Sequence, residues 1–386
     1  MLPINCHYLR RRSVHPELGA DFLNLRRLLA ASFLALASLD SVLVCFVGIS
    51  IFSASPIRAI GGQVRLILVF LVLSAQAFAG GLGHHAQLVV SDSRTTPRNG
   101  VRVTYLGTNN YQFEFKGRAL LVDPYFSRVD LLSVALGSHI QPSVARINEG
   151  LRYVVSNPDA ILVTHGHFDH LLDVPYIMAK TRARLIASAS SIALVRRLPD
   201  AGASLADAVS SGDVRRVGPW TIRVLPATHD RLFGKVPFNR SAVRESAPQR
   251  AADWICGEPL AFLIEVNGQR IYIDSGGTLA QLPPNESGNP RVDLAILGVA
   301  LPDSRARLHA ALERLQPRYV LPSHQDNFFR PLNAGFQFGL LTDFSRVQRE
   351  CAKENHSRLI LLDYSRPWTL PKMRSSKSRS LNPKEP

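Results

Sequence analysis

The sequence is poor in cysteine. It has only four among 386 residues, and no two show the C-x-x-C spacing of thiolate metal sites or redox centres. The pattern therefore argues against sulfur chemistry as the main activity. Cys256 and Cys351 could form one disulfide bond, but only in an oxidising compartment.

Lysine and acidic residues are also scarce. Lysine provides only seven of the 45 basic side chains, and the 30 acidic ones leave a net charge of +15. This balance could draw the protein toward phosphates, anionic membranes or acidic small molecules, although genome base composition accounts for an arginine bias equally well. We expect a small-molecule or lipid substrate with an anionic group, and no nucleic-acid partner is favoured.

Two apolar stretches precede the first strand-like region, Leu28 to Phe52 and Leu66 to Ala79. The second follows a basic residue and ends in a small-x-small pattern, so residues 64–79 are predicted to be a signal peptide of an exported, periplasmic protein. Residues 1–63 are an uncertain extension, because we expect translation to start at Val64. The alternative is a membrane anchor, since the first stretch could span ~30 Å of hydrocarbon.

Short apolar runs bounded by turns begin at Val101 and predict strands. The first three are separated by short turns, which is typical of a meander. The predicted strands are Val101–Leu106, Tyr111–Phe115, Ala119–Val122, Ala160–Val163, Arg184–Ala187, Trp220–Leu225, Leu260–Val266, Arg270–Ile273, Val292–Leu297 and Arg318–Leu321.

Apolar residues at three- and four-residue spacing predict helices between some of these strands. The helical segments are Asp173–Lys180, Ser190–Leu198, Ser304–Leu315 and Leu340–Glu354. Strands that come first in runs and then alternate with helices favour an α/β fold, a four-layer α/β/β/α sandwich. We place this domain at 101–365, a linker at 80–100 and a basic, disordered tail at 366–386.

The segment Thr164 to His170 reads THGHFDH and directly follows a buried-type strand. In an extended segment the i and i+2 side chains share a face, so His165 and His167 can converge on one ion. Asp169 and His170 follow where the chain turns toward a helix and can face a second ion. Imidazole and carboxylate ligands without thiolate favour Zn2+, with Mn2+ or Fe2+ as alternatives.

Three further candidate ligands also lie where a strand gives way to a loop. They are His229, Asp274 and His324. Each is an ordinary loop or turn residue when taken singly, but their order after the first motif marks them as parts of one site.

These residues resemble the metallo-β-lactamase superfamily, whose mark is H-x-H-x-D-H followed by His, Asp and His at strand ends. The resemblance covers roughly Val101 to Leu362 and implies three ligands for a first metal, His165, His167 and His229. It also implies a second metal held by Asp169, His170 and His324, with Asp274 bridging the two.

The early Asp123-Pro124 is similar to that of the branch containing ascorbate-phosphate lactonases and N-acyl-phosphatidylethanolamine phospholipase D. Asp123 is therefore a candidate for orienting a metal ligand, or else a simple turn-former. True β-lactamases of this fold usually lack the bridging aspartate, so Asp274 argues against β-lactam hydrolysis.

The resemblance implies a metal-dependent hydrolase whose two-metal-bound hydroxide cleaves an ester, lactone or phosphodiester, with Asp169 as the catalytic residue that orients the hydroxide. Two alternatives stay open: a mononuclear iron oxidoreductase of the same superfamily, and a non-catalytic metal-binding protein. The long loop Asp230 to Trp254 is expected to act as a lid, in which Arg231, Lys235 and Arg240 bind an anionic group of the substrate.

Overall fold

The structure, a computed structural model, describes residues 80–92, 100–198, 205–232, 234–239, 243–276 and 291–372. The predicted N-terminal extension and signal peptide lie outside these residues, as do Arg240 and most of the predicted tail. Among the helices that are described, none is long and apolar enough to cross a membrane.

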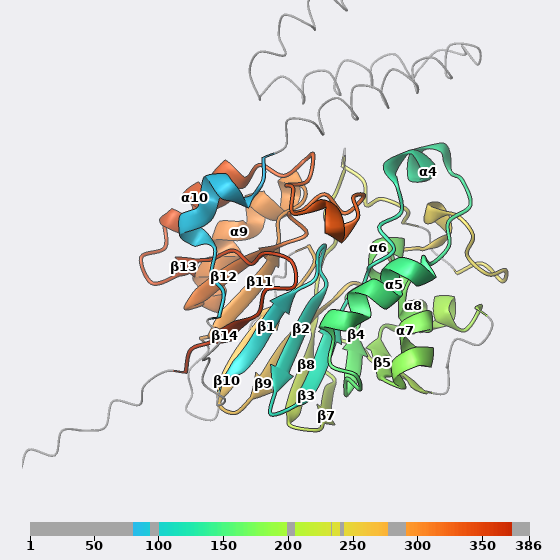
Figure 1. The fold of residues 1–386 in the computed structure, drawn as a ribbon, viewed down its shortest axis with the longest axis horizontal. Helices are drawn as coiled ribbons and strands as arrows, with labels where there is room; N and C mark the ends of the chain where they lie inside the picture. The colour runs from blue at the N-terminus through green and yellow to red at the C-terminus, as the bar shows by residue number, and fades with distance from the viewer. Residues whose placement is uncertain are drawn as a thin grey trace, which may run out of the picture. The chain divides into compact units, whose positions relative to one another are not determined.

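Two seven-stranded sheets form the centre of the described fold (Figure 1). In spatial order, the first consists of β14 (Trp368–Leu370), β1 (Val101–Tyr105), β2 (Tyr111–Phe115), β3 (Arg118–Val122), β4 (Ala160–Leu162), β5 (Arg184–Ala187) and β6 (Ala206–Ala208). The second consists of β13 (Arg358–Leu359), β12 (Tyr319–Ser323), β11 (Leu294–Gly298), β10 (Gln269–Ile273), β9 (Leu260–Val266), β8 (Trp220–Pro226) and β7 (Val214–Val217).

Both sheets use the same sequence of pairings. The strands β1 to β3 are antiparallel and β3 to β6 are parallel; likewise β7 to β10 are antiparallel and β10 to β13 are parallel. The predicted meander is therefore confirmed, and a structural repeat is present that the sequence does not reveal. Parallel strands end at a common edge, so loops that follow them can build one site.

Helices cover the outer face of each sheet. The described α-helices are α4 (Leu131–Leu136), α5 (Val144–Gly150), α6 (Phe168–Leu171), α7 (Val174–Thr181), α8 (Ala189–Val195), α9 (Pro302–Leu315) and α10 (Phe344–Ala352). Short 3-10 helices are η2 (Leu82–Leu88), η3 (Leu151–Tyr153), η5 (Ala251–Asp253) and η6 (Leu332–Ala334).

Strand side chains alternate between two cores, as the period of two requires. In β4, Leu162 packs between the sheets, whereas Ile161 packs against residues of α5 to α8. In β9, Ile264 packs between the sheets, whereas Leu263 packs against residues of α9 and α10. The predicted four-layer α/β/β/α sandwich is therefore confirmed (Figure 1).

The fold extends past both predicted limits of the domain. At the C-terminal side, β14 pairs with β1 and buries Trp368 and Leu370 between the sheets, so the predicted tail contributes a strand. At the N-terminal side, η2 lies within the predicted linker, and Val89 forms a bridge with Leu361. Both segments were missed because each has only two or three apolar residues. So few apolar residues do not predict a packed element until the surface against which they pack is known.

Three further strands, β6, β7 and β13, were not predicted from the sequence. They are short edge-side strands, and β7 carries two arginines, so their local pattern is weak. The disulfide considered for Cys256 and Cys351 is absent among the described residues, because both are buried free thiols.

Candidate metal centre

Four predicted ligands lie at the end of β4. His165 follows the strand, His167 is the residue just before α6, and Asp169 and His170 belong to that four-residue helix. All four residues are at most 6% exposed. The change from strand to helix within this segment turns successive side chains toward one region.

Two further predicted ligands come from the second sheet. His229 lies three residues after β8, and His324 directly follows β12. The backbone of His324 has a φ of 55°, in the left-handed region that few residues other than glycine adopt. The amide of His324 donates to the carbonyl of Thr108 over 2.8 Å, which links β12 to the turn between β1 and β2.

The six side chains form two groups, and within each group the ligand atoms lie within 4.8 Å of one another. The first group is His165, His167 and His229, and the second group is Asp169, His170 and His324. The Nε2 atom of His165 lies 3.0 Å from Nδ1 of His167, and Nε2 of His324 lies 2.9 Å from Oδ2 of Asp169. Each group thus matches one of the two predicted metal ions.

The seventh predicted ligand, Asp274, belongs to neither group. It follows β10 and is fully buried. Its Oδ2 accepts from the hydroxyl of Tyr272 at 2.9 Å, and its Oδ1 accepts from the amide of Gly298 at 3.1 Å. A bridging role for Asp274 therefore stays a prediction.

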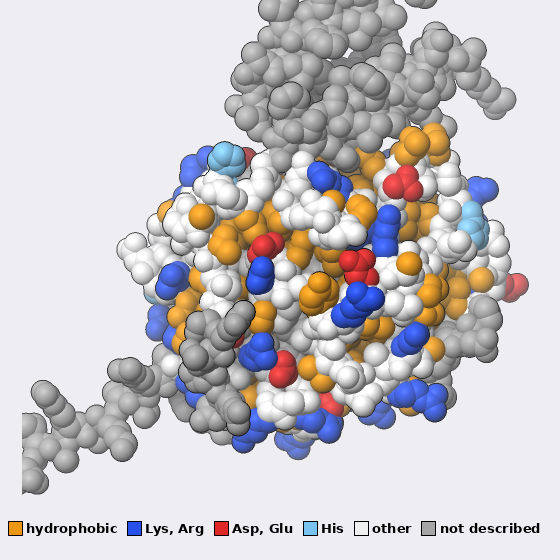
Figure 2. Space-filling view, in the orientation of Figure 1, with side chains coloured by type: hydrophobic (Ala, Val, Ile, Leu, Met, Phe, Trp, Pro, Cys, Tyr) orange, Lys and Arg blue, Asp and Glu red, His pale blue; other side chains and the backbone are white. Residues whose placement is uncertain are grey.

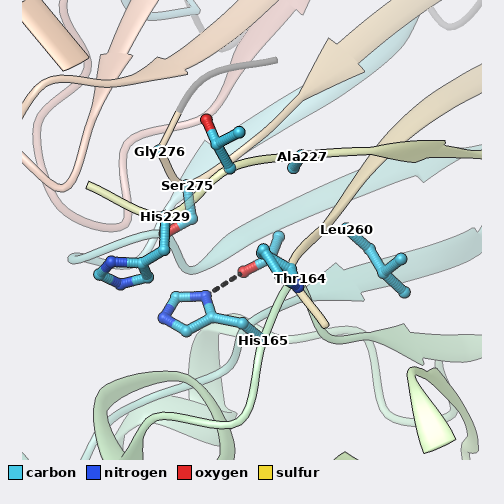
Figure 3. A pocket seen from close by; sticks show the side chains of 9 residues that line it. Thr164, His165, Ala227, His229, Leu260, Ser275 and Gly276 are labelled. Atoms are coloured by element: carbon cyan, nitrogen blue, oxygen red, sulfur yellow. Dashed lines mark hydrogen bonds between the residues drawn. The ribbon is translucent and has the colours of Figure 1, made fainter. Parts of the chain in front are cut away.

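The next residues, Ser275 and Gly276, line a narrow pocket together with His165 and His229. Figure 3 shows the two imidazoles facing each other beside Ser275. Their ring centroids are 4.6 Å apart. The turn after β10 therefore lies against the first group.

Each imidazole of the first group has one ring nitrogen held by a neighbouring oxygen. Nδ1 of His165 lies 3.1 Å from Oγ1 of Thr164, Nε2 of His167 lies 2.9 Å from the carbonyl of Pro237, and Nδ1 of His229 lies 2.7 Å from the carbonyl of Asp230. Metal-binding histidines are held in this way, because the partner fixes the tautomer and leaves the other nitrogen for the ion. The donor set therefore fits a metal.

Asp123 orients a ligand of the second group. Its Oδ2 lies 2.8 Å from Nδ1 of His170, so Nε2 of that ring is directed toward the group. The same carboxylate accepts from the amide and the hydroxyl of Thr164 at 2.7 and 2.6 Å. Asp123 thus contacts a candidate ligand of the second group, as the sequence predicted, and is linked to His165 of the first group only through Thr164.

Burial lowers the pKa of His165 and of His167 well below the usual value and lowers that of His229 to about 4. Neutral imidazole is the form that binds a metal. Burial also opposes charge on His170 and Asp169, but mutual attraction raises the pKa of His170 and lowers that of Asp169. The second group therefore has a ready anionic ligand.

The fold and the two ligand groups agree with a comparison against known proteins. A profile described as the beta-lactamase superfamily domain matches residues 102–324, which is more than half of the chain. This chain belongs to the β-lactamase superfamily. The matched region includes all seven predicted ligands, and the predicted superfamily is confirmed.

Several superfamily relatives carry the name UPF0173 metal-dependent hydrolase. The protein from Methanosarcina barkeri is 27% identical over 231 residues, covering 59% of this chain and 85% of its own. That from Aeropyrum pernix is 28% identical over 234 residues, covering 59% of this chain and 83% of its own. Among solved structures, the metallo hydrolase Igni18 of Ignicoccus hospitalis is 17% identical with a TM-score of 0.48, covering 71% of this chain and 99% of its own.

The loop that follows His229 is where the sequence placed basic substrate-binding residues. Arg231 and Lys235 are exposed, and among the contacts of the described residues neither side chain reaches the ligand groups. Figure 2 shows lysine and arginine side chains scattered over the visible face, with aspartate and glutamate among them. The net positive charge is therefore not gathered into one patch on that face.

Aromatic rings, in contrast, pack against both ligand groups. The ring centroid of Phe238 lies 6.0 Å from that of His167, and the centroid of Phe328 lies 4.8 Å from that of His324. The ring of Phe168 lies between them, 6.4 Å from Phe238 and 6.5 Å from Phe328. Phe238 and Phe328 are half-buried, so each ring also presents an outer face.

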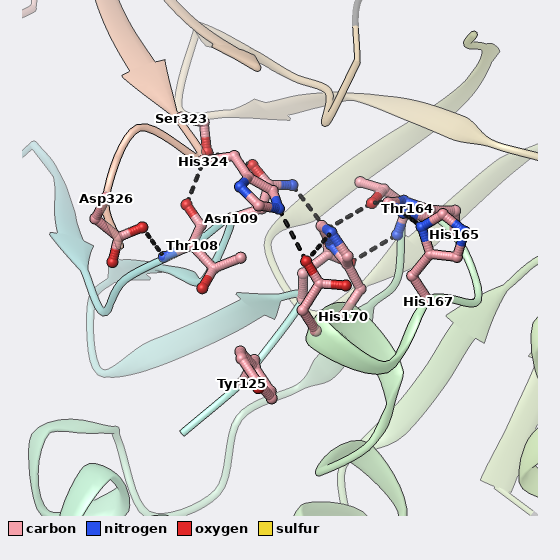
Figure 4. A network of polar contacts seen from close by, with 12 residues as sticks. Thr108, Asn109, Tyr125, Thr164, His165, His167, His170, Ser323, His324 and Asp326 are labelled. Carbon is pink, nitrogen blue, oxygen red and sulfur yellow. Dashed lines mark hydrogen bonds and ion pairs between the residues drawn. The ribbon is translucent and has the colours of Figure 1, made fainter. Parts of the chain in front are cut away.

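Sequence reasoning missed three residues at this site, Thr108, Asn109 and Phe328. The first two occupy the turn between β1 and β2, which lies beside the ligands of the second group (Figure 4). A usable signal was the polar Asn109-Asn110 pair at a strand end, and another was the Phe328-Phe329 pair just after His324.

Proposed function

We propose that the chain is a metal-dependent hydrolase that uses two divalent ions to cleave an ester, lactone or phosphodiester. The observation that carries the proposal is the pair of adjacent ligand groups, three side chains each, at one edge of the two sheets. The relatives named metal-dependent hydrolases support it. Residues 64–79 support the further proposal that the protein is exported to the periplasm.

His165, His167 and His229 would hold the first ion, and Asp169, His170 and His324 the second. Ions at such positions polarise a scissile carbonyl or phosphoryl group and lower the pKa of a water molecule. The protein's own contribution is to fix the ligands, through Asp123 and backbone carbonyls, and to supply a carboxylate in Asp169 that can orient water and accept a proton. All ligands are nitrogen or oxygen, which favours Zn2+ over softer ions.

We expect purified protein to contain close to two ions per chain, and the His167→Ala variant to contain fewer and to lose activity. The measurement is elemental analysis of both proteins, followed by a screen of the metal-loaded wild type against phosphodiesters, lactones and aryl esters. One redox-active iron per chain would favour the oxidoreductase alternative instead. Two ions without turnover of any tested class would favour the non-catalytic alternative.

The aromatic rings beside both groups indicate that the substrate carries an apolar group next to the scissile bond. Phe238 lies on the loop that follows His229, whereas Phe328 lies on the loop that follows His324, so an apolar group could contact two separate loops. Aromatic rings provide large, rigid contact surfaces of this kind. A lipid or an aryl ester would meet both conditions.

Replacing Phe238 by Ala is expected to raise KM for a neutral aryl ester about 3- to 10-fold, because an aromatic contact contributes roughly 0.5–1.5 kcal/mol beyond its area. KM for an acetyl ester of a small alcohol, which lacks the aromatic group, should stay unchanged. The metal content of the variant should also stay unchanged. Lys235→Ala, on the same loop, is the matched control and should leave KM for both esters unchanged. If only Lys235→Ala raises KM, and only for anionic substrates, the proposed anion binding by Arg231, Lys235 and Arg240 is favoured instead.

A further inference from the structure

The turn between β1 and β2, residues 107–110, contains no metal ligand, yet it contacts the supports of two ligands of the second group. We propose that Asn109 is a positioning residue for the second metal ion. Its side chain joins Asp123, which holds His170, to Ser323, the residue before His324. The inference rests on the proposed two-ion function and adds a residue to it.

The side chain of Asn109 has two partners and no exposed surface. Its Nδ2 donates to Oδ2 of Asp123 over 2.7 Å, and the same carboxylate oxygen contacts Nδ1 of His170 at 2.8 Å. Its Oδ1 accepts a hydrogen bond from the hydroxyl of Ser323, the residue before His324. Figure 4 shows Asn109 between His324 and His170.

His324 needs such support more than the other imidazoles do. Among the described residues its Nδ1 has no hydrogen-bond partner, and its Nε2 contacts Asp169, another ligand of the same group. No hydrogen bond to its Nδ1 therefore holds the ring in the way that Asp123 holds His170. The ring therefore depends on its backbone, which adopts a left-handed φ of 55° that is unfavourable for histidine.

The same turn holds this backbone from both sides of His324. The carbonyl of Thr108 accepts from the amide of His324 at 2.8 Å and from the hydroxyl of Ser323 at 3.3 Å. The amide of Thr108 donates to Oδ1 of Asp326 over 2.9 Å. Oδ1 of Asn109 is the nearer of two acceptors that share the hydroxyl proton of Ser323, so loss of the Asn109 side chain removes the closer of the two contacts that hold this hydroxyl.

The first group depends much less on this turn. His167 and His229 are held by the carbonyls of Pro237 and Asp230, which do not belong to this turn. Thr164, beside His165, bonds directly to Asp123 through its amide and its hydroxyl, so we expect it to keep both bonds when Asn109 is shortened. Removal of the Asn109 amide should therefore act on one ion only.

The test is a Zn2+ titration of the full chain by calorimetry, with wild type and Asn109→Ala compared. We expect the second ion to bind about 10–100-fold more weakly in the variant and the first to bind as in wild type, because residues behind metal ligands contribute to affinity by that factor. Asn109→Asp keeps the acceptor for Ser323 but places a carboxylate against Asp123, and should weaken the second ion at least as much.

The matched control is Asn267→Ala, which changes an asparagine in the turn between β9 and β10, at the opposite edge of the second sheet. It should bind both ions as wild type does.

The proposal would be overturned if folded Asn109→Ala bound both ions with wild-type affinity. It would also be overturned if the variant lost affinity for both ions to the same extent. If Asn109→Ala does not fold, the same titration is made with Ser323→Ala, which removes the hydrogen bond between Ser323 and Oδ1 of Asn109. Unchanged affinity of Ser323→Ala for the second ion would then overturn the proposal. Wild type that binds a single ion would refute the two-ion function itself.

Discussion

Replacing Asp169 by Asn should lower turnover by at least ~100-fold while the first ion stays bound, since orienting and proton-transfer groups contribute about that much. The carboxylate lies between His170 and His324, with 3.5 and 2.9 Å between the interacting atoms. An asparagine has nearly the same shape, but it carries no charge and cannot accept a proton. The first group, His165, His167 and His229, is complete without Asp169.

The experiment measures kcat, KM and metal content of wild type and Asp169→Asn in parallel, at saturating Zn2+. Saturation separates the loss of chemistry from the weaker binding of the second ion that the substitution also causes. A comparison with Asn109→Ala under the same conditions sharpens the result, because that variant should recover turnover when Zn2+ is in excess and Asp169→Asn should not. Turnover equal to wild type would remove Asp169 from the mechanism.

The ligands could be predicted from the sequence because each follows an apolar strand. One histidine or aspartate after a buried run is ordinary, but a dense motif after β4 followed by further candidates at later strand ends such as that of β12 is not, and strand ends converge by topology. The layer order could be predicted for a similar reason, since apolar periodicity is a local property of each segment. Both inferences need only short windows of sequence.

The hydrogen bonds among the residues that surround the ligands could not be predicted, because they join residues far apart in the chain. Asn109 and Ser323 are 214 positions apart, and Thr108 and Asp326 are 218 apart. An asparagine in a hairpin turn is ordinary in sequence, and only the folded arrangement gives it two buried partners. The loop after His229 shows the same limit, since its basic and aromatic residues are visible in the sequence but the packing of Phe238 against the ring of His167 is not.

A buried arginine is still harder to predict, because arginine is among the residues most often exposed. The side chain of Arg128 has no exposed surface, and its Nη2 donates to Oδ2 of Asp326 over 2.6 Å. The hydroxyl of Tyr364 donates to the same oxygen at 2.5 Å. Asp326 lies two residues beyond His324 and also accepts from the amide of Thr108, so the ion pair adjoins the turn that contacts the backbone of His324.

We expect Arg128→Met to lower the free energy of unfolding by about 3–5 kcal/mol, because it leaves the charge of Asp326 buried without its partner. Methionine fills a similar volume, so most of the loss reports the charge rather than a cavity. The double variant Arg128→Met with Asp326→Asn removes both charges. The amide oxygen in the place of Oδ1 can still accept from the amide of Thr108, and the amide nitrogen in the place of Oδ2 can donate to the hydroxyl oxygen of Tyr364. The double variant should regain most of the lost stability.

Denaturant unfolding of the four proteins, wild type, both single variants and the double variant, gives the coupling between the two residues at a fixed Zn2+ concentration. The fixed concentration is needed because bound ions stabilise the folded state by mass action. A loss below about 1 kcal/mol for Arg128→Met would mean that the pair behaves like an exposed one, for which that value is typical. A double variant as unstable as the single one would instead place the loss in packing around Gly107, whose Cα lies so close to the Arg128 guanidinium that a Cβ there would be 1.8 Å from Nη2.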